Sequence, residues 1–258
     1  MKFLKFTIAV FCLCNIVAIS YSLDKDSVVG MWLFDDGKGD VAKDSSGNGN
    51  DGKLISSPKW VNDGKIGGAL EFEFAKANNV RAPLPHSNTV TVALWAKYKT
   101  LPTANIGLIH VQAGEIVNGG PGTKTIGMWV ENSTQLWGRV IPDGGGNTNF
   151  PKNESLKADT WYHIAMVIDP TAKKARQYVN AKEVGVVDYP GKLTKYDFIN
   201  IGRQGSETWD GVIDEVIFLN EALSVDDLKK LSDGIEAALS VEPIHKLATT
   251  WGEIKATQ

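Results

Sequence analysis

The sequence predicts an all-β fold in which two sheets pack face to face as a sandwich or jelly roll. Short apolar or alternating runs recur along the chain, and Gly, Pro, Asn and Asp separate them, as in 118–122 and 142–146. Many short strands with such turns are typical of sandwiches and not of βαβ units. The expected strands are Val28–Phe34, Ala69–Phe74, Val90–Tyr98, Ile106–Val111, Ile126–Val130, Gln135–Ile141, Trp161–Ile168, Ala175–Val179, Phe198–Ile201 and Val212–Leu219.

Residues 1–22 have the pattern of a signal peptide. Lys2 and Lys5 give a positive start, and the apolar run Phe6–Ile19 that follows is short for a membrane span. Small serine residues at 20 and 22 stand where a signal peptidase cleaves. An uncleaved N-terminal anchor is the alternative. The sequence therefore predicts a secreted protein that is extracellular, periplasmic or held at the cell surface.

The composition of the mature chain limits the classes of molecule that it is expected to bind. Cys12 and Cys14 both lie in the signal segment, so the exported domain has no disulfide and must depend on its core. Cleavage removes two lysines and no acid, which changes the net charge from −3 to −5. This mildly acidic net charge argues against nucleic acid and anionic membranes as binding partners. No second apolar run is long enough to span a membrane.

One domain is expected over residues 23–233, with a tail of unknown role over 234–258. The tail holds an alanine-rich patch, Pro243, and the apolar residues Trp251 and Ile254. It could dock on the domain or serve in export or attachment, and its composition does not decide between these roles.

Alternation along the expected strands separates a core face from an opposite face. In Val90–Tyr98 the apolar residues at alternate positions share one side, and the same count makes Met128 and Val140 core residues. The residues predicted on the opposite face are Trp95, Trp129, Trp137, Arg139 and His163.

Two interpretations of this opposite face are open. Aromatic rings can stack on the apolar faces of sugars while Arg, His or Glu side chains bond hydroxyls, so the face would bind carbohydrate. Alternatively, long loops such as Ile116–Thr125 fold over it, and the tryptophans form a second small core. Trp161, which precedes His163, is expected to be structural.

The stretch Gly211–Ser224 is expected to form the closing strand and the start of a short C-terminal helix. Two acids, Asp214 and Glu215, interrupt its β-branched and aromatic residues. A buried carboxylate needs a partner, so Asp214 is expected to bind a metal or accept hydrogen bonds, whereas Glu215 points to solvent. Ser224 stands three residues before Asp227, close to a capping-box start.

This stretch resembles the last strand of laminin-G-like, concanavalin A-type jelly-roll domains, with its Gly-x-Ile-Asp-Glu-Val and Ala-Leu-Ser segments. Three earlier stretches resemble other parts of that family in the expected order: Trp32–Asp35 with Asp44–Gly52, Gly67–Phe72, and Trp161–Ala165 with Tyr178–Asn180. The resemblance covers about residues 28–232. It implies the same jelly-roll fold and a sheet face that often serves as the ligand surface.

The loop Asp44–Gly49 suggests a calcium site. Its oxygen side chains at the first, third and fifth positions and its glycine at the sixth are similar to the start of a calcium loop. The twelfth position is Ile55 and not glutamate, so the loop is not an EF-hand. The resemblance implies one structural Ca²⁺ ion, with ligands Asp35, Asp44, Asn48 and Asp214. The alternative is a turn closed by Asx hydrogen bonds.

The usual motifs of hydrolases, zinc enzymes and phosphate-binding loops are missing. Glu71 and Glu73 share one side of a strand, and related glucanases place a nucleophile and an acid in this way. Those enzymes carry a third acid after the pair, where this chain has Lys76 and Ala77. The chain is therefore expected not to be an enzyme.

These observations predict a secreted, non-catalytic module that binds carbohydrate or a glycoconjugate and holds one structural calcium ion. A second hypothesis is an adhesion or structural module that binds an extracellular protein. A third is a degenerate polysaccharide-cleaving enzyme, in which two carboxyl groups would lie about 5–5.5 Å apart in a groove.

Overall fold

The computed structural model describes residues 23–100, 103–114, 123–204 and 206–240. Leu23–Leu239 form one compact unit. The signal segment, most of the expected tail and most of the loop Ile116–Thr125 lie outside the described residues, so the predictions for them stay predictions. No helix in the described part of the chain is long and apolar enough to cross a membrane.

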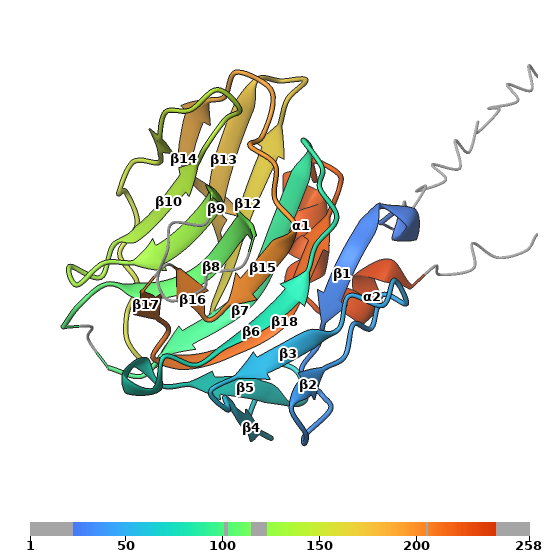
Figure 1. The fold of residues 1–258 in the computed structure, drawn as a ribbon, viewed down its shortest axis with the longest axis vertical. Helices are drawn as coiled ribbons and strands as arrows, with labels where there is room; N and C mark the ends of the chain where they lie inside the picture. The colour runs from blue at the N-terminus through green and yellow to red at the C-terminus, as the bar shows by residue number, and fades with distance from the viewer. Residues whose placement is uncertain (1–22, 101–102, 115–122, 205, 241–258) are drawn as a thin grey trace, which may run out of the picture. The chain divides into compact units, whose positions relative to one another are not determined.

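Two antiparallel sheets form the unit, as the sequence predicts (Figure 1). Sheet A has the order β14-β13-β12-β7-β18-β5-β4, and β1 also pairs with β18. Its strands are β1 (Val28–Trp32), β4 (Lys59–Val61), β5 (Ala69–Phe72), β7 (Val90–Tyr98), β12 (Tyr162–Asp169), β13 (Lys174–Val179), β14 (Lys182–Asp188) and β18 (Gly211–Leu219).

Sheet B has the order β11-β10-β9-β8-β15-β6-β3-β2. Its strands are β2 (Val41–Ala42), β3 (Gly52–Ile55), β6 (Asn79–Pro83), β8 (Ile106–Ala113), β9 (Thr123–Val130), β10 (Leu136–Val140), β11 (Thr148–Asn149) and β15 (Phe198–Ile201). A separate small hairpin pairs β16 (Arg203–Gln204) with β17 (Glu207–Thr208). Two 3₁₀ turns, η1 (Lys25–Ser27) and η2 (Phe74–Lys76), precede β1 and β6.

All ten expected strands are present, with ends that differ by at most a few residues. The eight strands that the sequence did not reveal are mostly short, and several carry polar residues or proline. β6, for example, includes Arg81 and Pro83, and it is held by pairing with β3 and β15. Such segments adopt strand conformation because they pair with neighbouring strands, and the local sequence does not show which strands are neighbours.

The main core fills the space between the sheets, and alternation identified its residues correctly. On β7, Val90, Val92 and Leu94 are fully buried in this core, as are Met128 on β9 and Val140 on β10. Burying one such side chain contributes about 1.5–3 kcal/mol. The core therefore fixes which side of each strand faces outward.

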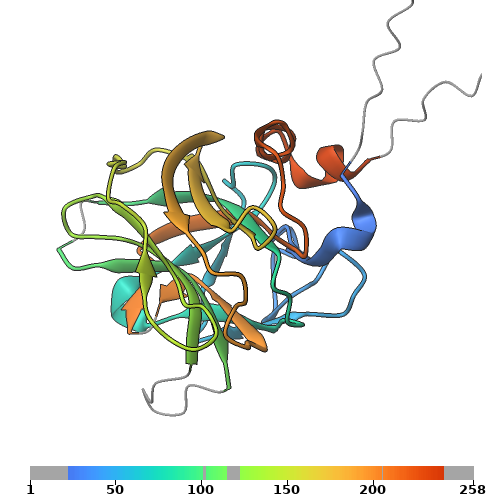
Figure 2. The same ribbon diagram turned by 90° about the horizontal axis from the view of Figure 1, so that it is seen from above.

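A second core covers part of the outer face of sheet A. The helices α1 (Val225–Ser232) and α2 (Ile235–Leu239) pack there beside β1 (Figures 1 and 2). The expected cap is confirmed, because the Asp227 amide donates to Ser224 Oγ at 3.2 Å. The helix α2 falls in the segment that the sequence assigned to the tail. Helical cover leaves the outer face of sheet B as the candidate ligand surface.

Candidate functional site

Two tryptophans lie opposite each other on the outer face of sheet B. Trp129 on β9 and Trp137 on β10 are directly paired across the antiparallel ladder, which brings side chains together on one face. Their ring centroids are 4.3 Å apart with an interplanar angle of 66°. We call Trp129, Trp137 and Arg139 the aromatic platform. Trp129 is 3% exposed, whereas Trp137 and Arg139 are half-buried, so Trp137 is the ring that the platform offers to a ligand.

Cationic groups hold the platform in place. The guanidinium carbon of Arg139 lies 5.3 Å from the Trp137 ring centroid and 5.5 Å from that of Trp129. Its Nε donates to Asn149 Oδ1 at 2.8 Å. The Nζ of Lys152 lies 4.5 Å from the Trp137 centroid and 2.7 Å from Glu131 Oε1. These cation–π contacts orient Arg139, and its other N–H groups can donate to a ligand oxygen.

A polar row continues from Arg139 across sheet B. Successive strand pairs place it in register with Gly127, His110, Asn200 and Arg81. Side chains that are directly opposite in an antiparallel pair share one face, so this row lies on the outer face with the platform. His110 and Asn200 in this row are buried, at 1% and 5% exposure, whereas Arg81 and Arg139 are half-buried, so the two arginines are the groups of the row that a ligand could reach.

The small hairpin β16–β17 supports the buried ring of Trp129. A Cβ on Gly127 would lie 3.0 Å from Gln204 Nε2 and 3.1 Å from Trp129 Cζ3, and one on Gly107 would collide with the Gln204 backbone. Glycine within a strand often marks such a close approach. Alternation along the strands does not indicate Gln204, Asn149 or Lys152, although Gly107 and Gly127 are residues of the kind that mark a close approach.

Trp95 and His163 lie on the other sheet, so the five predicted residues do not form one face. Both sit on the outer side of sheet A, in register with Asp214. Their ring centroids are 5.4 Å apart, and Lys65 Nζ lies 4.3 Å from the Trp95 ring. Trp95 is 8% and His163 is 2% exposed, and burial lowers the pKa of His163 to about 4. These contacts favour the interpretation of a second small core for this pair.

The predicted calcium ligands accept or donate hydrogen bonds within the chain. Asp44 accepts from the backbone amides of Met31, Ser46 and Asn50 at 2.9–3.0 Å. The bond from Ser46 to Asp44 Oδ1 is that of an Asx-type turn, the alternative to a calcium loop. The Nδ2 atom of Asn48 donates to the Val28 carbonyl at 2.7 Å.

The other two predicted ligands flank the loop 64–68. Asp35 Oδ1 accepts from the Gly68 amide at 2.6 Å. Asp214 Oδ2 accepts from the Lys65 and Ile66 amides at 2.8 and 2.9 Å, and Oδ1 from its neighbour Glu215 at 2.8 Å. Burial raises the pKa of Asp214 to about 7. This carboxylate therefore has three hydrogen-bond partners inside the fold.

These contacts do not fit one shared calcium site. A calcium ion takes six to eight oxygen ligands, and the oxygens of Asp44 and Asp214 already face N–H groups. The described residues include no group of three or more Asp, Glu, His or Cys side chains placed to hold a metal ion. Asp35 and Asp214 thus both bond to the loop 64–68, but the described residues show no cluster that joins them to Asp44, and the calcium ion stays a prediction.

Comparison with protein families decides the identity of the fold. A model of the concanavalin A-like lectin/glucanases superfamily matches residues 73–229, which is more than half of the chain. The chain belongs to this superfamily. The family predicted from the closing strand and three earlier stretches is thereby confirmed. A search of curated protein sequences finds no match.

Solved structures of the superfamily's fold align with most of the chain. Domain 4 of AbnA, a GH43 extracellular arabinanase from Geobacillus stearothermophilus in complex with arabinotriose, is 20% identical with a TM-score of 0.61; the alignment covers 80% of this chain and 98% of that domain. The binding domain of botulinum neurotoxin DC in complex with SialylT is 10% identical with a TM-score of 0.62, over 81% of this chain and 51% of that one. The Trypanosoma rangeli sialidase in complex with the inhibitor DANA is 13% identical with a TM-score of 0.57, over 80% and 32%.

At these identities the likeness shows the fold alone. The chain spans nearly all of the AbnA domain but only about half of the neurotoxin binding domain and about a third of the sialidase. The ligands and activities of those proteins are therefore not transferred to this chain as findings.

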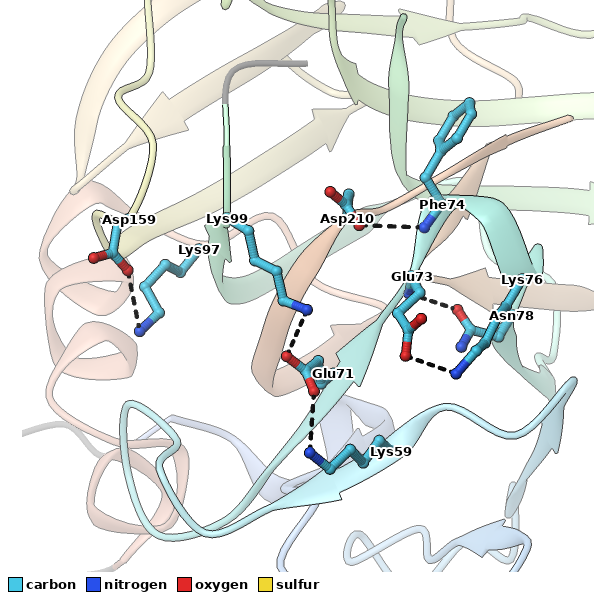
Figure 3. Close-up of polar contacts among 10 residues, drawn as sticks. All are labelled: Lys59, Glu71, Glu73, Phe74, Lys76, Asn78, Lys97, Lys99, Asp159 and Asp210. Atoms are coloured by element: carbon cyan, nitrogen blue, oxygen red, sulfur yellow. Dashed lines mark hydrogen bonds and ion pairs between the residues drawn. The ribbon is translucent and has the colours of Figure 1, made fainter. Parts of the chain in front are cut away.

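The superfamily includes glucanases, so the paired acids need a structural account. Glu71, on β5, lies beside two lysines: its carboxylate is 2.7 Å from Lys99 Nζ and 3.6 Å from Lys59 Nζ (Figure 3). The hydrogen bond from Lys99 holds the pKa of Glu71 below its usual value. Glu73 pairs with Lys76 at 2.8 Å. A general acid needs a raised pKa, so these contacts suit ion pairing better than proton donation.

Proposed function

We propose that this chain is a non-catalytic module that binds carbohydrate through the aromatic platform of sheet B. The observation that carries the proposal is the half-buried ring of Trp137, backed by Trp129 at 4.3 Å and flanked by Arg139. A sugar ring stacked on Trp137 would bring its hydroxyl or carboxylate oxygens within reach of the Arg139 guanidinium. The AbnA domain, nearly all of which this chain spans, was solved with arabinotriose and supports the ligand class.

A glycan array followed by calorimetric titration tests the proposal. Trp137→Ala should weaken binding of the best glycan at least tenfold, about 1.4 kcal/mol, while the melting temperature changes little. Trp161→Ala is a matched control, because Trp161 is also half-buried and has a lysine, Lys97, 5.2 Å from its ring on the other sheet. Equal losses in both variants, or no loss in Trp137→Ala, would overturn the assignment.

The adhesion-module hypothesis is an outcome of the same test. A chain that binds no glycan on the array but is captured by an immobilised extracellular protein through the platform would support it. We further infer export from residues 1–22, and mass spectrometry of the secreted product would check whether it begins at Leu23.

A further inference from the structure

A separate pocket of about 290 Å³ lies where η2, the chain after β7 and the start of β18 meet. Phe74 and Ala75 of η2 line it, together with Thr103, Ala104 and Asp210. Small-molecule pockets commonly measure about 300–1,000 Å³, so this one has room for a ligand the size of a single sugar ring.

An exposed aromatic residue, Phe74, lines this pocket. Phe74 is 42% exposed, one of few large apolar residues with such exposure in the described part of the chain. Its amide donates to Asp210 Oδ1 at 3.3 Å (Figure 3). Its carbonyl accepts from the Ala77 amide at 3.2 Å. These bonds hold the backbone of Phe74 in the 3₁₀ turn, and its exposed ring at the pocket is available for stacking.

The charges around the pocket are nearly balanced. Glu71 lies between Lys99 and Lys59, and Glu73 pairs with Lys76 (Figure 3). Within the described residues, Asp210 has no ion-pair partner inside 4 Å. The ammonium group of Lys99 is already paired with Glu71 at 2.7 Å and would attract an anionic ligand only weakly, and the Asp210 carboxylate would repel one. Two threonine hydroxyls, one carboxylate and apolar carbon line the pocket, and this set suits a ligand rich in hydroxyl groups.

Neutral sugars match the groups that line the pocket. A carboxylate accepts hydrogen bonds from neighbouring hydroxyls, and the hydroxyls of Thr100 and Thr103 can donate or accept. The Phe74 ring can stack on the apolar face of a sugar in the manner of aromatic contacts elsewhere. We infer that this pocket is a second carbohydrate-binding site, which takes one neutral sugar residue; the ligand class rests on the proposed function.

Nuclear magnetic resonance titration of the full chain with arabinotriose, xylotriose and cellotriose tests the inference. At least one triose should shift the amide signals of Phe74, Thr103 and Asp210. Phe74→Ala and Asp210→Asn should each weaken that response at least tenfold and leave the indole signal of Trp137 responsive to its own ligand. Val186→Ala is the matched control, because Val186 is a 43% exposed apolar residue on β14 and should change nothing.

The outcomes separate this pocket from the platform. The inference would be overturned if the amide signals of the pocket did not shift at millimolar triose, or if Phe74→Ala left the shifts unchanged. The result of the Trp137 test is independent of both outcomes. Shifts at Phe74 without any at Trp137 would support the pocket and count against the platform. Because Phe74 is exposed, we expect Phe74→Ala to have the melting temperature of the parent. If Phe74→Ala unfolds, Phe74→Leu takes its place, because leucine keeps the apolar bulk without the ring.

Discussion

Trp129 and Trp137 show what a single residue's position in a strand does and does not reveal. Alternation placed both on the side opposite the core, and the structure confirms this for each strand. It could not reveal depth: Trp129 is 3% exposed near the hairpin β16–β17, whereas Trp137 is half-buried. Truncating Trp129 would therefore cost roughly 3–5 kcal/mol of stability, so only Trp137→Ala tests binding without unfolding.

His163 should make the protein sensitive to acid. Burial lowers its pKa to about 4 in the folded state, against 6.5 for an unperturbed histidine. The unfolded chain therefore binds the proton more tightly, and the stabilising contribution of neutral His163 is complete above pH 6.5 and lost as the pH falls through 4. At about 1.36 kcal/mol per pKa unit, the loss approaches ~3 kcal/mol.

The measurement is the free energy of unfolding in urea at several pH values, for the parent and for His163→Phe, which keeps a ring beside Trp95. Relative to His163→Phe, the parent should lose up to ~3 kcal/mol of unfolding free energy as the pH falls from 7 to 4. The raised pKa of Asp214 acts in the opposite sense, so the parent alone would understate the effect. A difference that is constant with pH would contradict the prediction.

At the scale of elements, β18 departs from simple alternation. A bulge lies between Asp214 and Ile217, and Glu215 within it has a φ of 50°. The expectation that Glu215 points to solvent is wrong: it is 4% exposed, and its Oε2 accepts from the Ile235 amide at 2.7 Å. The bulge turns this side chain toward the first residue of α2, which no local sequence pattern indicated.

This hydrogen bond should anchor α2 to the sheet. Glu215→Ala would leave the Ile235 amide buried without its partner, and such a loss costs about 1–3 kcal/mol. We expect a lower melting temperature and faster hydrogen exchange over Ile235–Leu239. Glu236→Ala, an exposed acid in the same helix, is the control. Equal exchange rates in α2 for parent and Glu215→Ala would show that the second core alone holds the helix.

At the scale of the whole molecule, the sequence predicted the architecture better than the site. Ten strands with their core faces follow from alternation, which is a local property. The contacts of Asp214 are not local, since its partners Lys65 and Ile66 are 149 and 148 residues away. Which sheet carries each predicted residue depends on strand order, and alternation does not report strand order. Alternation therefore groups Trp95 and Trp137 on one face, although they lie on different sheets.

The response of the domain to calcium depends on those distant contacts. A calcium ion that binds only the folded form would stabilise it by about 2.7 kcal/mol at a hundredfold excess over the dissociation constant. Because backbone amides already occupy the oxygens of Asp44 and Asp214, we expect equal melting temperatures in calcium and in EDTA. Asp214→Ala should destabilise the fold to the same extent in both conditions, because it removes hydrogen bonds and not a metal ligand. A melting temperature that falls in EDTA for the parent, and not for Asp214→Ala, would instead establish the calcium site that the sequence predicts.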